Sequence, residues 1–240
     1  MDVLTGLPKG VFYASKPPAN QRARFPFGLG ENGVHEICER AHGDMAALTG
    51  FALTAMHGRG NKSANRNEGP VIWVRQSGLA YDHGSVMQAG LSQLRTPLRA
   101  LLTVSAYKRS EALWVTEEAI RSGAASLVIA ELDGADFTAS RRLTLASSRH
   151  GVPVILLMPY TRNGSTAATA RWRVSPRPSA LNRFDPNAPG PPRWQAVLER
   201  TRQSPHLAGS VYNLDFNDET LSLSVAAGLA AHTLQPRQTG

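Results

Sequence analysis

The chain has 240 residues, a length that suits one main hydrophobic core with at most a small appendage. It contains no run of about 18 apolar residues, and it does not begin with a basic segment followed by an apolar one, so we expect neither a membrane-spanning helix nor a secretory leader. Its single cysteine, Cys38, excludes a disulfide framework. These features predict a soluble protein of the reducing cytoplasm.

The formal net charge of +8 and the isoelectric point of about 10.2 indicate an acidic partner, with nucleic acid first, although general solubility is an alternative. Arginine outnumbers lysine by 22 to 4, which favours planar contacts to phosphate or carboxylate and is also what a GC-rich genome would produce. The segment 162–202 holds eight arginines against Asp185 and Glu199, a net charge of +6. Most of the positive excess therefore lies in this one segment.

The first part of the chain predicts a leader and then regular elements. Residues 1–27 combine prolines and basic residues without a period, so we expect a flexible leader. The elements expected next are a β-strand at 34–38, a helix at 46–57, a polar loop at 58–69 and a second strand at 70–75.

The middle of the chain continues the alternation of strands and helices. Ser110 is the expected N-cap of a helix that stops at Gly123. The predicted elements are a strand at 101–106, a helix at 111–122, a strand at 126–132, a helix at 138–149 and a strand at 152–158. This order predicts a doubly wound, mostly parallel α/β sheet.

Beyond Pro159 the apolar residues alternate with period two, which predicts antiparallel strands that extend the sheet. These strands are expected at 171–175, 193–199 and 210–216, after a loop at 161–169 and around a long proline-rich connection. The chain then divides into a leader (1–27), an α/β core (28–160), an arginine-rich β extension of the same domain (161–220) and a tail (221–240).

The junction between the first strand and the first helix is where nucleotide-hydrolysing α/β domains carry the phosphate-binding loop G-x-x-x-x-G-K-[ST]. Counting from the strand, Glu39 stands at the first glycine, Met45 at the lysine and Ala46 at the hydroxyl. Glu39 and Asp44 would also place negative charge where a triphosphate would lie. We therefore expect a vacant, degenerate loop, no cofactor and no enzyme activity.

Several motifs together resemble the ImuA family of RecA-like proteins, over a span from about Leu29 to Phe216. The most specific is an Arg-Trp-Arg-Val run followed by Pro-x-Pro-Ser within 170–179, and Trp114 in Glu-Ala-Leu-Trp supports it. The others are His-Glu-Ile at 35–37, Val-Ile-Trp-Val at 71–74, the paired arginines within 138–146 and Gly-Val-Pro-Val-Ile-Leu-Leu at 151–157. The resemblance implies a RecA-like fold.

The resemblance also implies a function in bacterial damage-inducible mutagenesis, as an accessory factor without ATPase activity. Such proteins act in translesion synthesis beside ImuB, a homologue of Y-family polymerases, and an error-prone DnaE-type polymerase. They are expected to contact ImuB through the C-terminal part and to interact with RecA, and self-association is a further expectation. The loop is degenerate in that family too, although glycines and a proline often remain where Glu39, Arg40 and Asp44 stand here.

The arginine-rich extension is the best candidate for binding a partner or single-stranded DNA. Arg171 and Arg173 flank Trp172, a combination that holds phosphates and stacks on a base or a peptide plane. The alternative is an amphipathic strand with Trp172 in the core and the arginines solvated. Arg162 lies where RecA carries a mobile DNA-contacting loop. The candidate residues are Arg162, Arg171, Trp172, Arg173, Arg177, Arg193, Arg200 and Arg202.

Other polar residues are interpreted as structural. Glu131 ends the fourth strand, where a RecA-like ATPase places the acid that orders the Mg²⁺ shell, but the missing lysine and hydroxyl favour a structural or loop-capping carboxylate. Glu36 lacks the base and nucleophile that catalysis requires. The seven histidines lack metal-ligand spacing, so no metal site is expected.

Three hypotheses from different classes stay open at this point. The first is a non-catalytic adaptor of a mutagenic polymerase complex. The second is an ATP-dependent recombinase or motor, which Met45 and Ala46 disfavour. The third is a stand-alone single-stranded DNA-binding protein, whose affinity would fall steeply with salt. A SulA-like division inhibitor would bind the tubulin-like division ring protein, which the basic C-terminal third gives no reason to expect.

Overall fold

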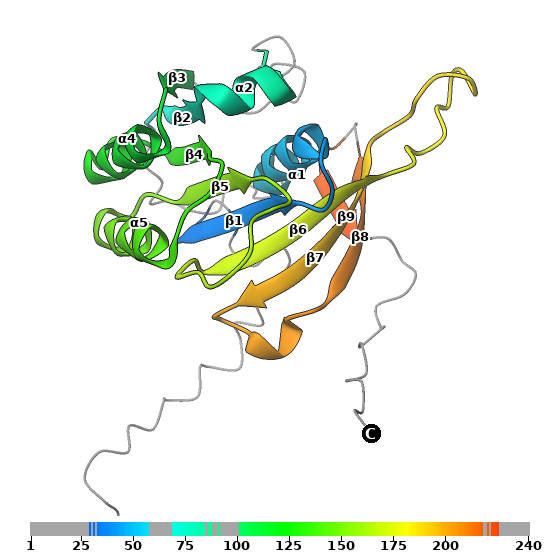
Figure 1. Ribbon diagram of the computed structural model, residues 1–240. Helices are drawn as coiled ribbons and strands as arrows, with labels where there is room; N and C mark the ends of the chain where they lie inside the picture. Colours follow the sequence, from blue (N-terminus) through cyan, green and yellow to red (C-terminus); the bar gives the residue numbers. More distant parts are fainter. Residues whose placement is uncertain are drawn as a thin grey trace, which may run out of the picture.

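A computed structural model describes residues 29, 31, 33–57, 69–84, 86, 87, 91, 101–217, 220 and 222–225. The leader expected at 1–27, most of the polar loop expected at 58–69 and most of the tail expected at 221–240 lie outside the described residues. Within the described part, nine strands form one sheet in the order β3-β2-β4-β5-β1-β6-β7-β8-β9 (Figure 1). The α/β fold class predicted from the sequence is confirmed, and the arrangement is consistent with a RecA-like fold.

The elements follow the predicted alternation closely. Helix α2 was not predicted from the sequence, and every predicted strand is present with bounds that shift by at most two residues. The first nine elements are β1 (Val34–Glu39), α1 (Met45–His57), β2 (Val71–Gln76), α2 (Ser77–His83), β3 (Leu101–Ala106), α4 (Arg109–Arg121), β4 (Leu127–Glu131), α5 (Phe137–His150) and β5 (Val154–Met158). The remaining elements are β6 (Ala170–Arg177), β7 (Arg193–Thr201), a 3-10 turn (Pro205–Leu207), β8 (Val211–Asn217) and β9 (Ser222–Val225).

The strand β6 corrects one prediction, because it runs parallel to β1 and not antiparallel to it. The connection 159–169 leaves β5 at its carboxyl end and returns across β1, so that Ala170 pairs with His35 near the start of β1. The antiparallel pairs of the described sheet are β6–β7, β7–β8 and β8–β9. The sheet therefore has six parallel strands and an antiparallel end.

Two apolar clusters cover the two faces of the sheet. On one face α1 packs over β1 and β6, with Phe51 and Trp172 among the largest buried side chains. On the other face α4 and α5 lie side by side and bury Ile120 and Leu143 (Figure 1). Strands β4 and β5 are buried at every position, as expected for parallel strands covered on both faces.

Local hydrogen bonds fix where α4 begins. Ser110 is not the N-cap of α4, because the helix begins at Arg109 and Lys108 is its cap. The Glu111 carboxylate accepts the amides of Tyr107 and Lys108 at 3.1 and 3.2 Å, so the first turn is fixed from inside the helix.

Among the described residues, no helix is long and apolar enough to cross a membrane.

Candidate functional site

The loop 40–44 joins β1 to α1 at the carboxyl edge of the parallel strands. An Asp44 carboxylate oxygen accepts the amide of Ala41 at 3.0 Å, and the Asp44 carbonyl accepts the amides of Ala47 and Leu48 at 2.9 and 3.1 Å. Met45, the first residue of α1, packs into the core. The loop thus holds a carboxylate of its own at the helix N-terminus, where partial positive charge favours it.

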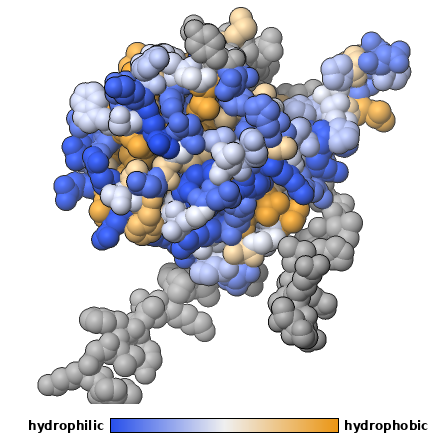
Figure 2. Space-filling view, viewed as in Figure 1, coloured by the Kyte–Doolittle hydropathy of each residue, from blue (hydrophilic) through white to orange (hydrophobic). Residues whose placement is uncertain are grey.

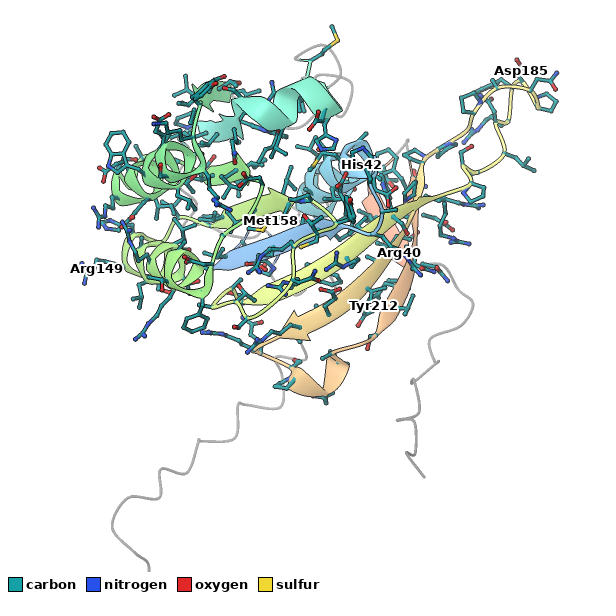
Figure 3. The ribbon with its side chains drawn as sticks, in the orientation of Figure 1. Arg40, His42, Arg149, Met158, Asp185 and Tyr212 are labelled. Carbon is teal, nitrogen blue, oxygen red and sulfur yellow. The ribbon has the colours of Figure 1, made fainter. Side chains whose placement is uncertain are left out.

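Glu39 ends β1 and is fully buried. Its Oε2 accepts the amide of Tyr160 at 3.2 Å, and its Oε1 lies 4.0 Å from Nδ1 of His83 at the end of α2. The ring of His42 stands 6.0 Å from that of His83 and 5.9 Å from that of Tyr160, and His42 and Arg40 both lie at the carboxyl end of β1 (Figure 3). His83 is therefore the ring beside the carboxylate, and the ring of His42 lies close to those of both His83 and Tyr160.

The sequence did not indicate this grouping of His42 and His83 with Glu39. The histidines were considered only for metal-ligand spacing, and nothing local placed His83 in a helix. Among the described residues, no group of three His, Cys, Asp or Glu side chains could hold a metal ion.

Glu131 lies at the carboxyl end of β4 and is buried. Its Oε1 accepts the indole N–H of Trp73 at 2.6 Å, and its Oε2 accepts Nε–H of Arg75 at 3.3 Å. Both partners come from β2, the neighbouring strand. These contacts agree with a structural role for the carboxylate.

Two arginines from the predicted binding set are interior residues. Glu36 is fully buried on β1, and its carboxylate accepts Arg171 Nε at 2.6 Å, Arg162 Nη2 at 3.3 Å and Thr166 Oγ1 at 2.6 Å. Only 6% of Arg171 and 8% of Arg162 are exposed. The β1–β6 register puts Glu36 opposite Arg171, and a buried carboxylate needs a counter-charge. The expectation that these two guanidinium groups face a ligand is therefore corrected.

Trp172 is fully buried on the opposite face of β6. Its ring lies 5.9 Å from that of Phe51 and 6.0 Å from that of Tyr212. The interpretation of Trp172 as a core residue is confirmed, and stacking of this indole on a base or peptide is corrected. The same interpretation expected the arginines beside Trp172 to be solvated, and this is wrong for Arg171, which is buried.

Arg173 connects three segments of the chain. Its guanidinium binds both carboxylate oxygens of Glu199 at 2.6 and 3.3 Å and donates to the carbonyls of Glu39, Tyr160 and Arg162 at 2.9 to 3.0 Å. Burial alone would lower the pKa of Arg173, but the hydrogen bond and charge of Glu199 raise it above its ordinary value. Through these contacts Arg173 links the end of β1 to β7 and to the β5–β6 connection.

The other predicted arginines remain at the surface in two groups. Arg177 and Arg193 stand opposite each other where β6 and β7 begin to separate, and Arg193 lies 2.9 Å from Asp215 of β8. Arg200 and Arg202 are exposed at the far end of β7. These four are the members of the predicted set that a partner can reach.

Cys38 is buried at the end of β1, next to Glu36 on the same strand. Burial, with a smaller contribution from the charge of Glu36, raises the pKa of the thiol from 9.0 to about 12. The thiol is therefore protonated at neutral pH and is a packing group.

The sequence matches no protein-family model. It is 31% identical over 185 residues to "Protein ImuA" of two strains of Caulobacter vibrioides, and the match covers 73% of this chain and 72% of the relatives. Among solved structures, the crystal structure of SulA from Pseudomonas aeruginosa matches with a TM-score of 0.38 and 16% identity, over 52% of this chain and 97% of that one.

Proposed function

Because the chain belongs to the ImuA family, as the sequence motifs predicted, we propose that it is a non-catalytic adaptor in damage-inducible translesion DNA synthesis and mutagenesis. It bridges an ImuB-type homologue of Y-family polymerases, RecA and single-stranded DNA in the cytoplasm, and reaches an error-prone DnaE-type polymerase indirectly. Its RecA-like core serves as a scaffold for these contacts and binds no nucleotide.

The observation that carries the proposal is the loop 40–44 with its flanking residues. The lysine and hydroxyl positions hold Met45, which is buried in the core, and Ala46. Asp44 already accepts the Ala41 amide, and Glu39 adds a second carboxylate beside the loop. Phosphate binding at such a junction depends on amides and cations that face the ligand, and carboxylates repel it.

The distribution of surface arginine supports a contact with acidic partners. Arg177 and Arg193 lie at one end of the β6–β7 pair, while Arg200 and Arg202 lie at the other. Single-stranded DNA or carboxylate-rich protein surfaces fit this chemistry. Contact with DNA therefore forms part of the proposal and rests on these four residues.

The test is co-purification of the full-length chain with its ImuB-type homologue and, separately, with RecA, with and without ATP and Mg²⁺. We expect retention of the ImuB-type homologue that does not change with ATP, together with no phosphate release from ATP in the presence of single-stranded DNA. Saturable, Mg²⁺-dependent hydrolysis stimulated by single-stranded DNA would overturn the non-catalytic role. Absence of both partners from the purified fraction would overturn the adaptor role.

The DNA contact has its own test. Fluorescence anisotropy with a labelled single-stranded oligonucleotide at two salt concentrations should show an affinity that falls with salt. Replacing Arg200 and Arg202 by alanine should weaken binding, while replacing Arg141 and Arg149, two exposed arginines of α5, by alanine serves as the matched control. Equal losses for the two proteins would indicate a general charge effect and not a site.

A further inference from the structure

The connection between β6 and β7, residues 178–192, projects from the body of the molecule, and we refer to it as the β6–β7 arm (Figure 1). Asp185 lies at its tip (Figure 3). Leu181 and Phe184 are each 88% exposed, the highest values among the large apolar side chains of the described residues. In the space-filling view the arm carries apolar side chains away from a mostly hydrophilic face (Figure 2).

The stem of the arm is fixed by its backbone. Leu181 forms a β-bridge with Pro189, and the Ala180 amide donates to the Pro191 carbonyl at 2.9 Å. A Cβ atom at Gly190 would lie 2.3 Å from the Ala180 carbonyl oxygen, so the two sides of the stem approach too closely for any other residue. Prolines on both sides remove further backbone freedom.

The tip is also ordered by hydrogen bonds. Asn182 Oδ1 accepts the amides of Phe184 and Asp185 at 2.9 and 3.2 Å, and Asp185 Oδ1 accepts the Asn187 amide at 2.9 Å. The Arg183 guanidinium lies over the Phe184 ring, 5.7 Å from its centroid. The backbone thus holds Leu181 and Phe184 outward in one arrangement before any partner binds.

An ordered loop that exposes large apolar side chains is suited to binding. Leu181 and Phe184 contribute little to the core, because nearly all of their surface is in water. A preordered loop loses little conformational entropy on association, and an aromatic side chain beside an arginine is a common centre of binding energy.

The charges select the kind of partner. Arg183 lies over the Phe184 ring, and Asp185 is the one acid within 178–192. Arg177 and Arg193 lie at the base of the arm, where Arg193 is 2.9 Å from Asp215. An apolar pocket with carboxylates at its rim is complementary to this pattern. Single-stranded DNA fits less well, because Leu181 has no ring to stack on a base and Asp185 repels phosphate at the tip.

We propose that the β6–β7 arm is a protein-docking element, in which Leu181 and Phe184 enter an apolar pocket with an acidic rim on the ImuB-type homologue. The inference rests on the proposed function, and it names the surface of this chain that makes the contact. Arg183 beside Phe184, and the partly exposed Arg177 at the base of the arm, supply the positive charge that an acidic rim would meet, whereas Arg193 is paired with Asp215.

The experiment measures binding of full-length chains to the immobilised ImuB-type homologue. The double variant Leu181→Ser/Phe184→Ser should bind at least about tenfold more weakly than the unmodified chain, as for loss of central interface residues. Leu145→Ser is the matched control, because Leu145 is 61% exposed on α5, away from the arm, and its affinity should stay within about twofold. Arg183→Glu should weaken binding and reduce its dependence on salt.

The outcomes separate the inference from the proposed function. If the unmodified chain binds and the double variant binds equally well, the arm is not the docking element, although the adaptor role stands. If the unmodified chain does not bind, the adaptor role itself fails. Two further results would overturn the inference. In the first, the double variant loses affinity for a single-stranded oligonucleotide but not for the ImuB-type homologue. In the second, the double variant differs from the unmodified chain only in its self-association, measured by sedimentation without a partner.

Discussion

The carboxyl edge of β1 and the β6–β7 arm differ in whether their side chains contact the protein or water. At the edge, Glu39 is buried: its Oε2 accepts the Tyr160 amide, its Oε1 lies 4.0 Å from His83 Nδ1 without a hydrogen bond, and its carbonyl accepts Arg173. In the arm, the backbone is tied by hydrogen bonds while Leu181 and Phe184 face water. The position expected for nucleotide chemistry is therefore occupied by the protein's own side chains, whereas the apolar surface open to a partner lies on a connection between strands.

Removing the buried carboxylate of Glu36 should lower the free energy of unfolding most. Glu36→Ala would leave Arg162 and Arg171 buried without their counter-charge, and breaking such a pair costs about 3–5 kcal/mol. Urea unfolding followed by tryptophan fluorescence measures the loss. Glu118→Ala breaks an exposed ion pair with Arg121 and should cost less than about 1 kcal/mol. Equal losses for the two variants would contradict the distinction between interior and surface arginines.

The second effect concerns the buried thiol at the same edge. Because the pKa of Cys38 is about 12 when folded and 9.0 as its ordinary value, the unfolded chain loses this proton first as pH rises. The free energy of unfolding should therefore fall between pH 9 and 12, by up to about 1.4 kcal/mol per pH unit. The measurement is the free energy of unfolding as a function of pH for the unmodified chain and for Cys38→Ala. The difference between the two slopes gives the contribution of the thiol.

A thiol reagent gives the complementary measurement. At pH 8 the folded chain should react with it no faster than it unfolds, since the thiolate is the reactive form. Rapid labelling of the folded protein would show that Cys38 is accessible, against its burial in the structure.

A third prediction tests the loop at the end of β1. Asp44→Ala removes the acceptor of the Ala41 amide and a negative charge at the N-terminus of α1, and should cost about 1 kcal/mol. Asp136→Ala is the matched variant, because Asp136 caps α5 through the Ala139 amide at 2.6 Å and should lose a similar amount. If Asp44→Ala were instead stabilising, the carboxylate would not stabilise the N-terminus of α1, and this interpretation of the loop would be wrong.

The exposed ring of Phe184 in the arm should contribute least to the free energy of unfolding. Phe184→Ser should change the free energy of unfolding by less than about 0.5 kcal/mol, because the ring contributes almost no buried surface. Thermal melting followed by circular dichroism checks this. A loss above 1 kcal/mol would mean that Phe184 stabilises the fold, and the contrast between the filled edge and the exposed arm would disappear.

Much of the fold could be predicted from local patterns. The strand at 101–106 agrees with the structure residue for residue, and the α5 helix differs from its predicted bounds by one residue at each end. The direction of β6 could not be predicted, because parallel pairing depends on where the connection 159–169 crosses the sheet. Helix α2 has no strong period and forms at the end of β2.

The α/β alternation, the loss of lysine and hydroxyl beside β1 and the location of the basic segment can be read from the sequence, because each is a property of neighbouring residues. The roles of the arginines depend on contacts between distant parts of the chain. Glu36 and Arg171 are 135 positions apart and meet because β6 lies next to β1, which takes one charged side chain out of water. The arm is visible as a binding element only in three dimensions, since exposure depends on what the rest of the chain leaves uncovered.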